Sequence, residues 1–320
     1  MKSSEPLRGF SGERRHTLKT PSALPPLLEE ALCAGRLSHA LCLEEESAAR
    51  RMETALALAG AILCQKKQGH MCGECAACRK VLMGAHADLT ICDPAENKDA
   101  YKKENLRTLR AEAYRRPVEG DAKVVLLQSA ELISAEGQNL LLKIIEEPPE
   151  DTVFILTCAN RYRLLGTVLS RVTVYPLPPL PETESMQRLQ ELAPGHTGEE
   201  YGRALVRCGG SPEAGALLLR DAATQKRYAA AEEMLAGLST GNGYRVMAAA
   251  APMERDRVQY AALLETLASL LATPLLREIY NLPDRTAARF RGELMPLFAL
   301  CERNAYLPLM TAVLVKRCKR

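Results

Sequence analysis

The sequence predicts an α/β protein in which helices cover both faces of a parallel sheet, followed by a segment made only of helices. Three observations predict this class. Short apolar runs without polar alternation, typical of strands buried on both faces, alternate with helical patterns between residues 39 and 175. The proline-rich stretch PLPPLP at residues 176–181 is expected to be a stiff linker. Beyond it the apolar residues follow helical spacing, interrupted by glycine clusters.

The first half alternates helices and strands in order. Helices are expected over residues 27–37, 47–64, 106–114 and 138–147. Strands are expected over residues 39–43, 88–92, 123–128, 152–158 and 172–175. The last of the four helices should stop at residues 148–149, because two consecutive prolines cannot continue a helix. This alternation implies parallel strands joined by helical crossovers.

The second half contains only helical patterns, and the whole chain is divided accordingly. Helices are expected over residues 184–192, 201–208, 212–220, 224–238, 258–280 and 284–318. The predicted domains are a fraying N-terminal tail (1–26), a core domain (27–178) with a cysteine module at about 64–80, a small helical domain (179–220) and a C-terminal helical domain (221–320). A nucleic-acid-binding arm is the alternative for the polar, basic tail.

Composition limits the classes of function. The 42 basic and 39 acidic residues give a net charge of +3, too balanced for a dedicated nucleic-acid binder. Aromatic residues make up 4% with no Trp, so contacts with nucleic acid should run through phosphates rather than base stacking. No long apolar stretch or signal peptide is evident, since uncharged runs stay well below the roughly 20 residues of a membrane span. We therefore expect a cytoplasmic protein without a membrane partner.

Four of the eleven cysteines cluster with the spacing C-x7-C-x2-C-x2-C, at Cys64, Cys72, Cys75 and Cys78. Two-residue gaps let successive thiolates turn back onto one ion, and four thiolates fill the tetrahedral shell of a structural zinc. The sequence therefore predicts one structural Zn²⁺ with no open position for catalysis. Substitution of one thiolate by His70 and an iron–sulfur cluster are the alternatives.

Several stretches together resemble the clamp-loader branch of the AAA+ ATPases. They are KVVLLQSAELISAEGQNLLLKIIEEPPEDTVFILTCANRYRLLGTVLSR at residues 123–171 and LEEALCAGRLSHAL at residues 28–41. The inserted four-cysteine module is also similar to that of bacterial clamp-loader subunits. The resemblance covers residues 27–219, and it implies an AAA+ (RecA-like) core with a zinc module, a small helical lid and a C-terminal oligomerisation collar.

The family's phosphate loop should follow the strand at residues 39–43, where backbone N–H groups and a Lys cradle phosphates and a hydroxyl binds magnesium. In an ungapped alignment, the GxxGxGKT-like position contains Glu45, Glu46, Ser47, Ala48, Ala49, Arg50, Arg51 and Met52. The glycines are absent, Arg51 replaces the Lys, and Met52 replaces the hydroxyl residue. Three acidic residues, Glu44 to Glu46, would also repel phosphate. The sequence predicts that this chain binds no nucleoside triphosphate.

The second nucleotide-binding element is also lost. A Walker B strand ends in acidic residues that hold magnesium and polarise water. The matching positions here are Gln128 and Ser129, and only Glu131 is acidic nearby. Both halves of one chemical site are therefore absent.

A possible arginine finger is retained. Ser170 and Arg171 end the stretch TVLSR, where clamp-loader subunits share a Ser-Arg-Cys motif, although Val172 replaces the Cys here. The resemblance implies that Arg171 reaches the ATP of a neighbouring subunit and that Ser170 positions it. A surface ion pair is the alternative for Arg171. In the lid, residues 209–211 are similar to the motif that carries a second nucleotide-sensing Arg, but Glu213 stands near that position.

An inactive ATPase core with a retained trans arginine is similar to the family member that does not hydrolyse ATP. The resemblance implies a five-subunit DNA polymerase III assembly with gamma/tau and delta subunits, which loads a sliding clamp onto primed DNA. The chain would have no activity of its own within this DNA-directed DNA polymerase holoenzyme. The alternatives are an active gamma/tau-like ATPase, a stand-alone zinc-containing DNA-binding protein and, more weakly, a hydrolase using Glu146 and Glu147.

Overall fold

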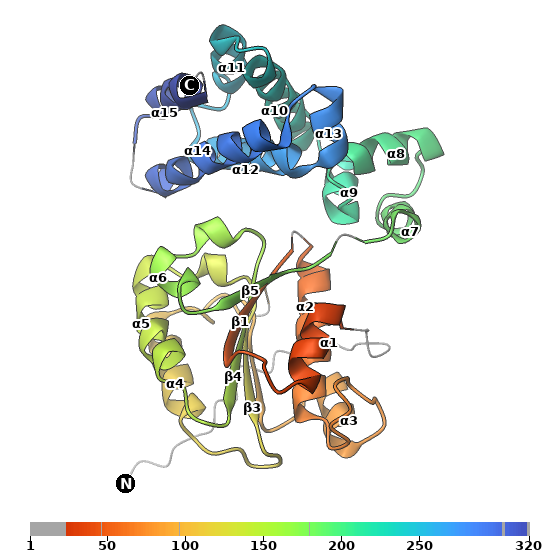
Figure 1. Ribbon diagram of the computed structural model, residues 1–320, viewed down its shortest axis with the longest axis vertical. Helices are drawn as coiled ribbons and strands as arrows, with labels where there is room; N and C mark the ends of the chain where they lie inside the picture. Colours follow the sequence, from red (N-terminus) through yellow and green to blue (C-terminus); the bar gives the residue numbers. More distant parts are fainter. Residues whose placement is uncertain (1–23, 46, 96, 179, 303–304, 319–320) are drawn as a thin grey trace. The chain divides into compact units, whose positions relative to one another are not determined.

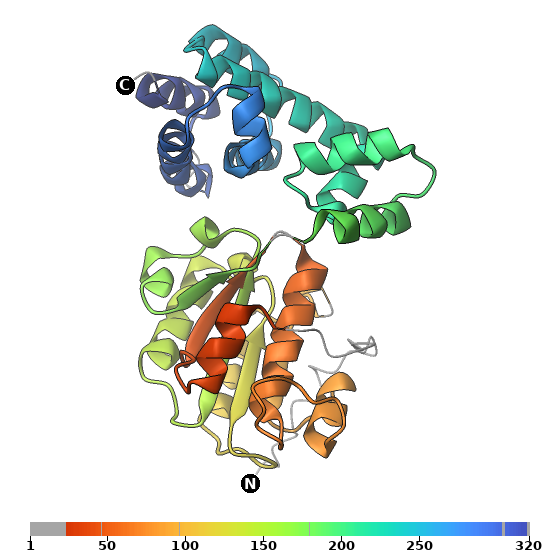
Figure 2. The same ribbon diagram turned by 45° about the vertical axis from the view of Figure 1, so that its right-hand side comes forward.

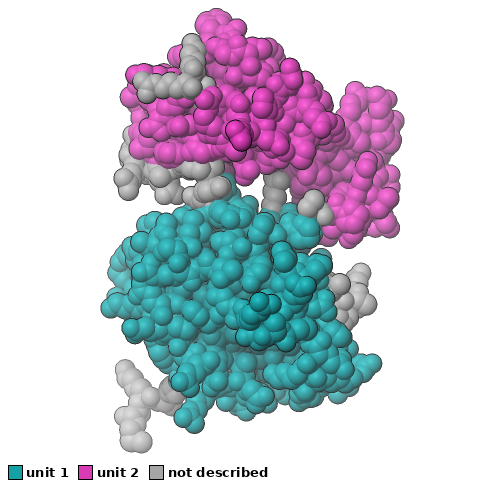
Figure 3. Space-filling view, viewed as in Figure 1, with its two compact units in different colours: residues 1–178 teal, residues 179–320 magenta. Residues whose placement is uncertain are grey.

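The computed structural model describes residues 24–45, 47–95, 97–178, 180–302 and 305–318. The chain divides into two compact units, residues 1–178 and residues 179–320 (Figure 3). Only the last three residues of the tail expected over residues 1–26 lie in the described part of the chain.

A five-stranded parallel sheet forms the centre of the first unit, with the strand order β2-β3-β4-β1-β5 (Figure 1). The strands are β1 (Ala40–Glu44), β2 (Leu89–Cys92), β3 (Lys123–Leu127), β4 (Thr152–Cys158) and β5 (Thr173–Pro176). Every residue of β3 is buried, as are all but one of β4. Burial on both faces explains why these two strands have apolar runs without alternation, and the predicted α/β class is confirmed.

Helices cover both faces of this sheet (Figures 1 and 2). One face packs against α1 (Pro26–Cys33), α2 (Ala48–Leu63) and α3 (Ala76–Leu82). The other packs against α4 (Lys103–Ala113), α5 (Ala135–Glu146) and α6 (Gly166–Leu169). Two 3-10 turns, η1 (Ala130–Leu132) and η2 (Arg161–Arg163), follow β3 and β4. Two separate apolar clusters, one on each face, therefore hold the sheet in place.

Some helices of the first unit differ from the predicted ones at their N-terminal ends. Helix α5 begins at Ala135 rather than residue 138, because Ser134 caps it and its Oγ accepts from the N–H of Gly137 at 3.2 Å. Helix α3 was not predicted. It begins where the Cys75 side chain accepts from the N–H of Cys78, so a cysteine serves as its N-cap.

The second unit is entirely helical. Its helices are α7 (Glu182–Leu192), α8 (Gly198–Arg207), α9 (Pro212–Arg220), α10 (Ala222–Ser239), α11 (Gly243–Ala250), α12 (Arg257–Ala272), α13 (Pro274–Ile279), α14 (Asp284–Glu302) and α15 (Leu307–Cys318). One buried apolar cluster contains residues from α7 through α15. The boundary expected at residue 220 between a lid and a collar therefore stays a prediction.

Three features of the second unit differ from the sequence-based expectation. The helix predicted over residues 284–318 is two helices, α14 and α15. The helix predicted over residues 258–280 is broken between α12 and α13, because Pro274 has no N–H to continue it and begins a new helix instead. Helix α11 was not predicted, and Asn242 caps it by accepting from the N–H of Arg245 at 3.1 Å. Within the described ranges, no helix combines the length and apolarity that crossing a membrane requires.

Candidate functional site

The carboxyl ends of β1, β3 and β4 lie next to one another in the sheet order, and the residues after them form the candidate site. Open α/β sheets bind ligands outside the carboxyl ends of their strands. The residues at this edge are Glu44 after β1, Gln128 and Ser129 after β3, and Thr157 near the end of β4. They occupy the place where the resemblance implied a nucleotide site.

The connection between β1 and α2 is short. Strand β1 ends at Glu44 and α2 begins at Ala48, which leaves residues 45–47 between them. Ser47 caps the helix, with its Oγ accepting from the N–H of Arg50 at 3.3 Å. The positions aligned with the second half of the GxxGxGKT pattern are therefore helical, and few backbone N–H groups are left to surround phosphates.

Arg51 points into the protein at the position where the family has its phosphate-binding Lys. The residue is 3% exposed, and one Nη donates to the backbone oxygen of Glu45. The other, Nη2, donates to the Ser129 Oγ at 3.1 Å and lies 3.9 Å from the Glu131 carboxylate, whose side chain is 5% exposed. The guanidinium thus links the β1–α2 connection to the turn after β3.

Two of the acidic residues that the sequence led us to expect to repel phosphate, Glu44 and Glu45, are paired with arginines. The Glu44 carboxylate accepts from the backbone N–H of Arg161 at 2.9 Å and from its Nε at 2.6 Å. Glu45 forms an ion pair with Arg50 at 2.6 Å, and Arg50 also donates to the backbone oxygen of Pro178 at 2.8 Å. Glu46 lies outside the described residues. Arginines from the same chain therefore neutralise the two described carboxylates.

The residues at the Walker B position serve the protein's own structure. The Gln128 side chain is 4% exposed, accepts from the Thr157 hydroxyl at 2.6 Å and donates to the Ala48 backbone oxygen at 3.1 Å. Ser129 has a left-handed backbone with φ 55°, and its N–H donates to the same Thr157 hydroxyl at 2.9 Å. These hydrogen bonds join α2, β3 and β4 directly, in the place where a magnesium ion would need carboxylates.

Arg171 lies at the carboxyl-terminal end of α6 and is 37% exposed at its side chain. Its Nη1 donates to the Thr167 backbone oxygen at 2.9 Å and to the Ser170 Oγ at 3.0 Å. Its Nε lies 2.5 Å from a carboxylate oxygen of Glu146, the last residue of α5. Ser170 thus contacts the arginine that it was predicted to position, and Arg171 also makes the ion pair that the alternative named.

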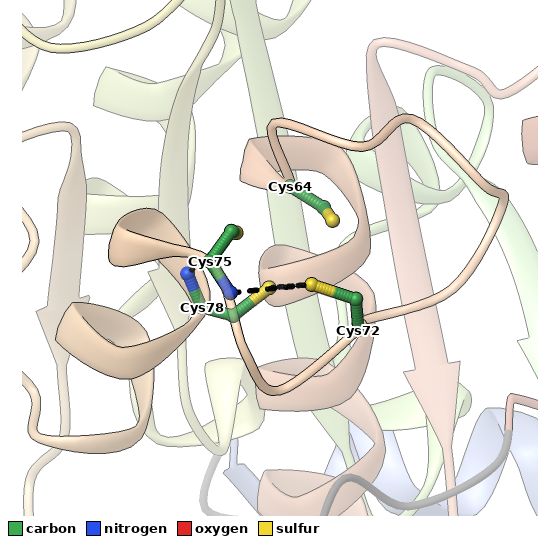
Figure 4. A group of neighbouring side chains, drawn as sticks. All are labelled: Cys64, Cys72, Cys75 and Cys78. Carbon is green, nitrogen blue, oxygen red and sulfur yellow. Dashed lines mark hydrogen bonds between the residues drawn. The ribbon is translucent and has the colours of Figure 1, made fainter.

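The four predicted metal ligands come together at one point (Figure 4). The Sγ atoms of Cys64, Cys72, Cys75 and Cys78 all lie within 4.8 Å of one another. Cys64 ends α2 and the other three come from the following loop and α3, so the module is tied to the sheet through α2. Gly73 between them has φ 75°, which a glycine adopts without strain. The group that the structure brings together contains no histidine, and His70 is exposed.

The geometry of this cluster suits a tetrahedral metal. Zn–S bonds of about 2.3 Å place tetrahedral sulfurs about 3.8 Å apart, and the Cys72 and Cys78 sulfurs are separated by 3.7 Å. Burial raises the pKa of Cys75, but backbone N–H groups of Cys78 and Gln65 and neighbouring thiols lower it further, to about 6. The backbone N–H of Cys75 likewise lowers the pKa of Cys72. At Cys72 and Cys75 these groups favour the thiolate, the form that binds metal, whereas burial raises the pKa of Cys78.

Glu213, near the position of the second nucleotide-sensing arginine, belongs to the second unit. It lies in the first turn of α9 and forms an ion pair with Arg188 of α7, whose Nε lies 2.8 Å from the Glu213 carboxylate. This ion pair holds two helices of the same unit together.

Comparisons with known proteins identify the family. A family model described as "DNA polymerase III, delta subunit" matches residues 21–181, half of the chain. The DNA polymerase III subunit delta' of Escherichia coli is 31% identical over 245 residues, which cover 76% of this chain and 72% of that protein. The chain belongs to the delta-prime family of DNA polymerase III subunits.

Other relatives match shorter segments. The delta' subunit of Yersinia pestis is 39% identical over 43% of this chain, and the matched segment spans 41% of that relative. A gamma/tau subunit of Mycobacterium tuberculosis is 31% identical over 48% of this chain and 27% of its own length. A solved gamma subunit-related protein from Thermotoga maritima is 16% identical with a TM-score of 0.38, covering 91% of this chain and 98% of its own.

Two ion pairs of the site could not be predicted from the sequence. Arg161 pairs with Glu44 across 117 positions, and Glu146 pairs with Arg171 across 25. Neither pair lies in a spacing that a single strand or helix would bring together, and opposite charges at such separations are common in any chain. Only the packing of η2 on the sheet edge and of α6 on α5 makes them partners.

Proposed function

We propose that this delta-prime family member is the non-hydrolysing subunit of a bacterial DNA polymerase III clamp loader. It assembles with gamma/tau and delta subunits in the cytoplasm and binds no ATP itself. It supplies Arg171 as an arginine finger to the ATP site of a neighbouring subunit, so that the assembly places the sliding clamp on primed DNA. One observation carries the first part of the proposal: the Arg51 guanidinium, at the position aligned with the phosphate-binding Lys, is already bonded to Glu45 and Ser129.

Three features support the absence of ATP binding. The connection at residues 45–47 offers few backbone N–H groups, so it lacks the cradle on which phosphate binding depends. Arg51 is bonded within the protein, and freeing it for a phosphate would leave Glu131 as a buried carboxylate without its cation. Gln128 and Ser129 provide no carboxylate for magnesium.

The position of Arg171 supports the finger. Arg171 follows a short helix of the first unit, and more than a third of its side chain is exposed. A guanidinium neutralises charge on a transferring phosphoryl group through its planar pair of donors. An arginine finger in this chain would act on a nucleotide that another subunit brings, because we expect this chain to bind none.

We also propose that Cys64, Cys72, Cys75 and Cys78 hold one Zn²⁺. The sulfur separations and the lowered thiol pKa values support this assignment. With four thiolates the ion would be fully coordinated, so its contribution is structural: it would fix the loop between α2 and α3. An iron–sulfur cluster is the alternative that metal analysis tests.

Calorimetric titration of the full chain with ATP and magnesium tests the first part. We expect no saturable heat at concentrations that saturate the gamma/tau subunit of the same organism. Saturable binding that Arg51→Ala abolishes would instead show an active nucleotide site. The gamma/tau-like ATPase alternative would then be correct.

Reconstitution tests the second part. A loader assembled with Arg171→Ala should contain the normal amount of this chain but hydrolyse ATP more slowly when clamp and primed DNA are present. Arginine fingers supplied in trans contribute about 10³- to 10⁵-fold in well-studied GTPases. One finger among several ATP sites should show a smaller loss. Equal rates at equal incorporation of the two chains would contradict the proposal.

A further inference from the structure

We propose that Glu146 is a positioning residue for the arginine finger: it holds the Arg171 guanidinium through Nε and leaves Nη2 available to a phosphate of the neighbouring subunit. This inference rests on the proposed finger function. It assigns a role to a carboxylate that otherwise stands at the end of α5 before two prolines, where solvated charge is the usual outcome.

The contacts of Arg171 involve two of its three guanidinium nitrogens, Nε and Nη1. The Nε lies 2.5 Å from Glu146, and Nη1 donates to the Thr167 backbone oxygen and the Ser170 hydroxyl. A guanidinium has five N–H donors. Within the described part of the chain Nη2 has no partner, so its two N–H groups can reach a ligand while the other nitrogens stay bound.

Helix α5, which ends at Glu146, is held in place by packing. Leu141, Ile144 and Ile145 of α5 are buried in the same apolar cluster as Val168 of α6 and Val172 after it. At the other end of this contact, a side-chain oxygen of the buried Gln138 accepts from the backbone N–H of Leu165, which precedes α6, at 2.8 Å. The finger segment is thus fixed to α5 at both ends: at Leu165 by Gln138, and at Arg171 by Glu146.

ATP hydrolysis should be faster when the Arg171 guanidinium is already held in place than when it must be ordered. An arginine side chain has many rotamers, and ordering it at each encounter with ATP costs conformational entropy. Contacts that are already made before ATP arrives reduce this cost, which is the usual role of supporting residues around a catalytic group. The carboxylate also lowers the net charge near Arg171, and this opposes phosphate binding. The experiment decides which of the two effects is larger.

Loaders reconstituted with single and double variants test the inference. Glu146→Ala removes the carboxylate, and Glu147→Ala is the matched control, because the Glu147 side chain makes no hydrogen bond or ion pair among the described residues. We expect Glu146→Ala to lower kcat for ATP about two- to fivefold, the range that one exposed ion pair supports. The KM for ATP should stay unchanged, since another subunit binds the nucleotide. Glu146→Gln should retain part of the rate through its amide oxygen.

The Arg171→Ala background separates positioning from a general structural effect. There, Glu146→Ala should cause no further loss, because the residue that it positions is gone. All single variants should have the thermal stability and incorporation of the Glu147→Ala chain. Loss of protection of the Arg171 Nε–H signal in Glu146→Ala, measured by NMR on the full chain, should accompany the lower rate.

The possible outcomes are distinguishable. If Arg171→Ala causes no loss, the finger function fails and the positioning role fails with it. If Arg171→Ala slows hydrolysis but Glu146→Ala matches Glu147→Ala, only the positioning role is overturned. A faster Glu146→Ala loader would show that the carboxylate sequesters the finger, and an additional loss in the Arg171→Ala background would show that it acts elsewhere; each result overturns the inference.

Discussion

The guanidinium of Arg51 donates to the hydroxyl of Ser129 across 3.1 Å, which joins the two elements that would hold ATP phosphates and magnesium in an ATPase. Arg51 comes from the first turns of α2, and Ser129 from the turn after β3. In an ATPase a bound ligand would bridge these two elements. Here a hydrogen bond within the protein connects them. Its energetic role leads to the first prediction.

Arg51→Met should destabilise the first unit by about 3–5 kcal/mol, because it leaves the Glu131 carboxylate buried without its cation. Arg50→Met is the control: Arg50 also pairs with a glutamate, but its side chain is 15% exposed, so its loss should cost less. Urea unfolding of both variants measures the difference. Equal losses would show that the Arg51 network adds little, and adding Glu131→Gln to Arg51→Met should recover part of the stability.

Zinc should be present at one equivalent per chain after purification without added metal. The four sulfurs are already close together, and thiolate ligation should fix the loop between α2 and α3. Elemental analysis gives the stoichiometry, and iron in place of zinc would contradict the assignment. Removal by a chelator should expose Cys72 and Cys75 to alkylation, measured by mass spectrometry, while Cys92 in the sheet stays protected because it is fully buried.

Alkaline pH should destabilise the first unit through its buried thiols. Burial raises the pKa of Cys92 to about 12, whereas a thiol of the unfolded chain ionises near 8.5. Between these values the folded state keeps a proton that the unfolded state loses, so the free energy of unfolding falls as the pH rises through this window. The stability contribution is fully present below about pH 8.5.

Cys92→Ala isolates that contribution. Within the window between the two pKa values, one such group changes the slope of the free energy of unfolding against pH by about 1.4 kcal/mol per pH unit. Urea unfolding of the two chains between pH 9 and pH 10.5 should therefore give a shallower decline for the variant, whatever its stability at neutral pH. Parallel pH profiles would show that Cys92 ionises in the folded chain as easily as in the unfolded one.

Arg171→Lys should restore only part of the ATPase rate that Arg171→Ala loses in the reconstituted loader. An ammonium supplies the charge but not the planar pair of donors, and it cannot hold Glu146 at one edge while presenting another. Steady-state hydrolysis with clamp and primed DNA measures the three chains side by side. Full activity of the Lys variant would mean that charge alone accounts for the role of Arg171.

Local sequence patterns predicted much of the architecture. The strand at Thr152–Cys158 follows its apolar run residue for residue, and α9 has its predicted bounds because Ser211 and Pro212 begin it. The cysteine cluster was predictable for the same reason: ligands two residues apart can meet through a tight turn, whatever the rest of the fold does. The sequence also predicts that nucleotide chemistry is lost, since glycine, lysine and acidic residues are absent from positions that need them.

Only the tertiary structure decided what the replacing residues do. The sequence suggested that Glu44 and Glu45 would repel phosphate, but both are neutralised by arginines, and Glu44 finds its partner in Arg161 on a separate element. Arg51 could have pointed to solvent. Its burial depends on Ser129 and Glu131, which lie in the turn after β3. Side-chain pairing between distant segments depends on how helices pack on the sheet, and local periodicity contains no information about that packing.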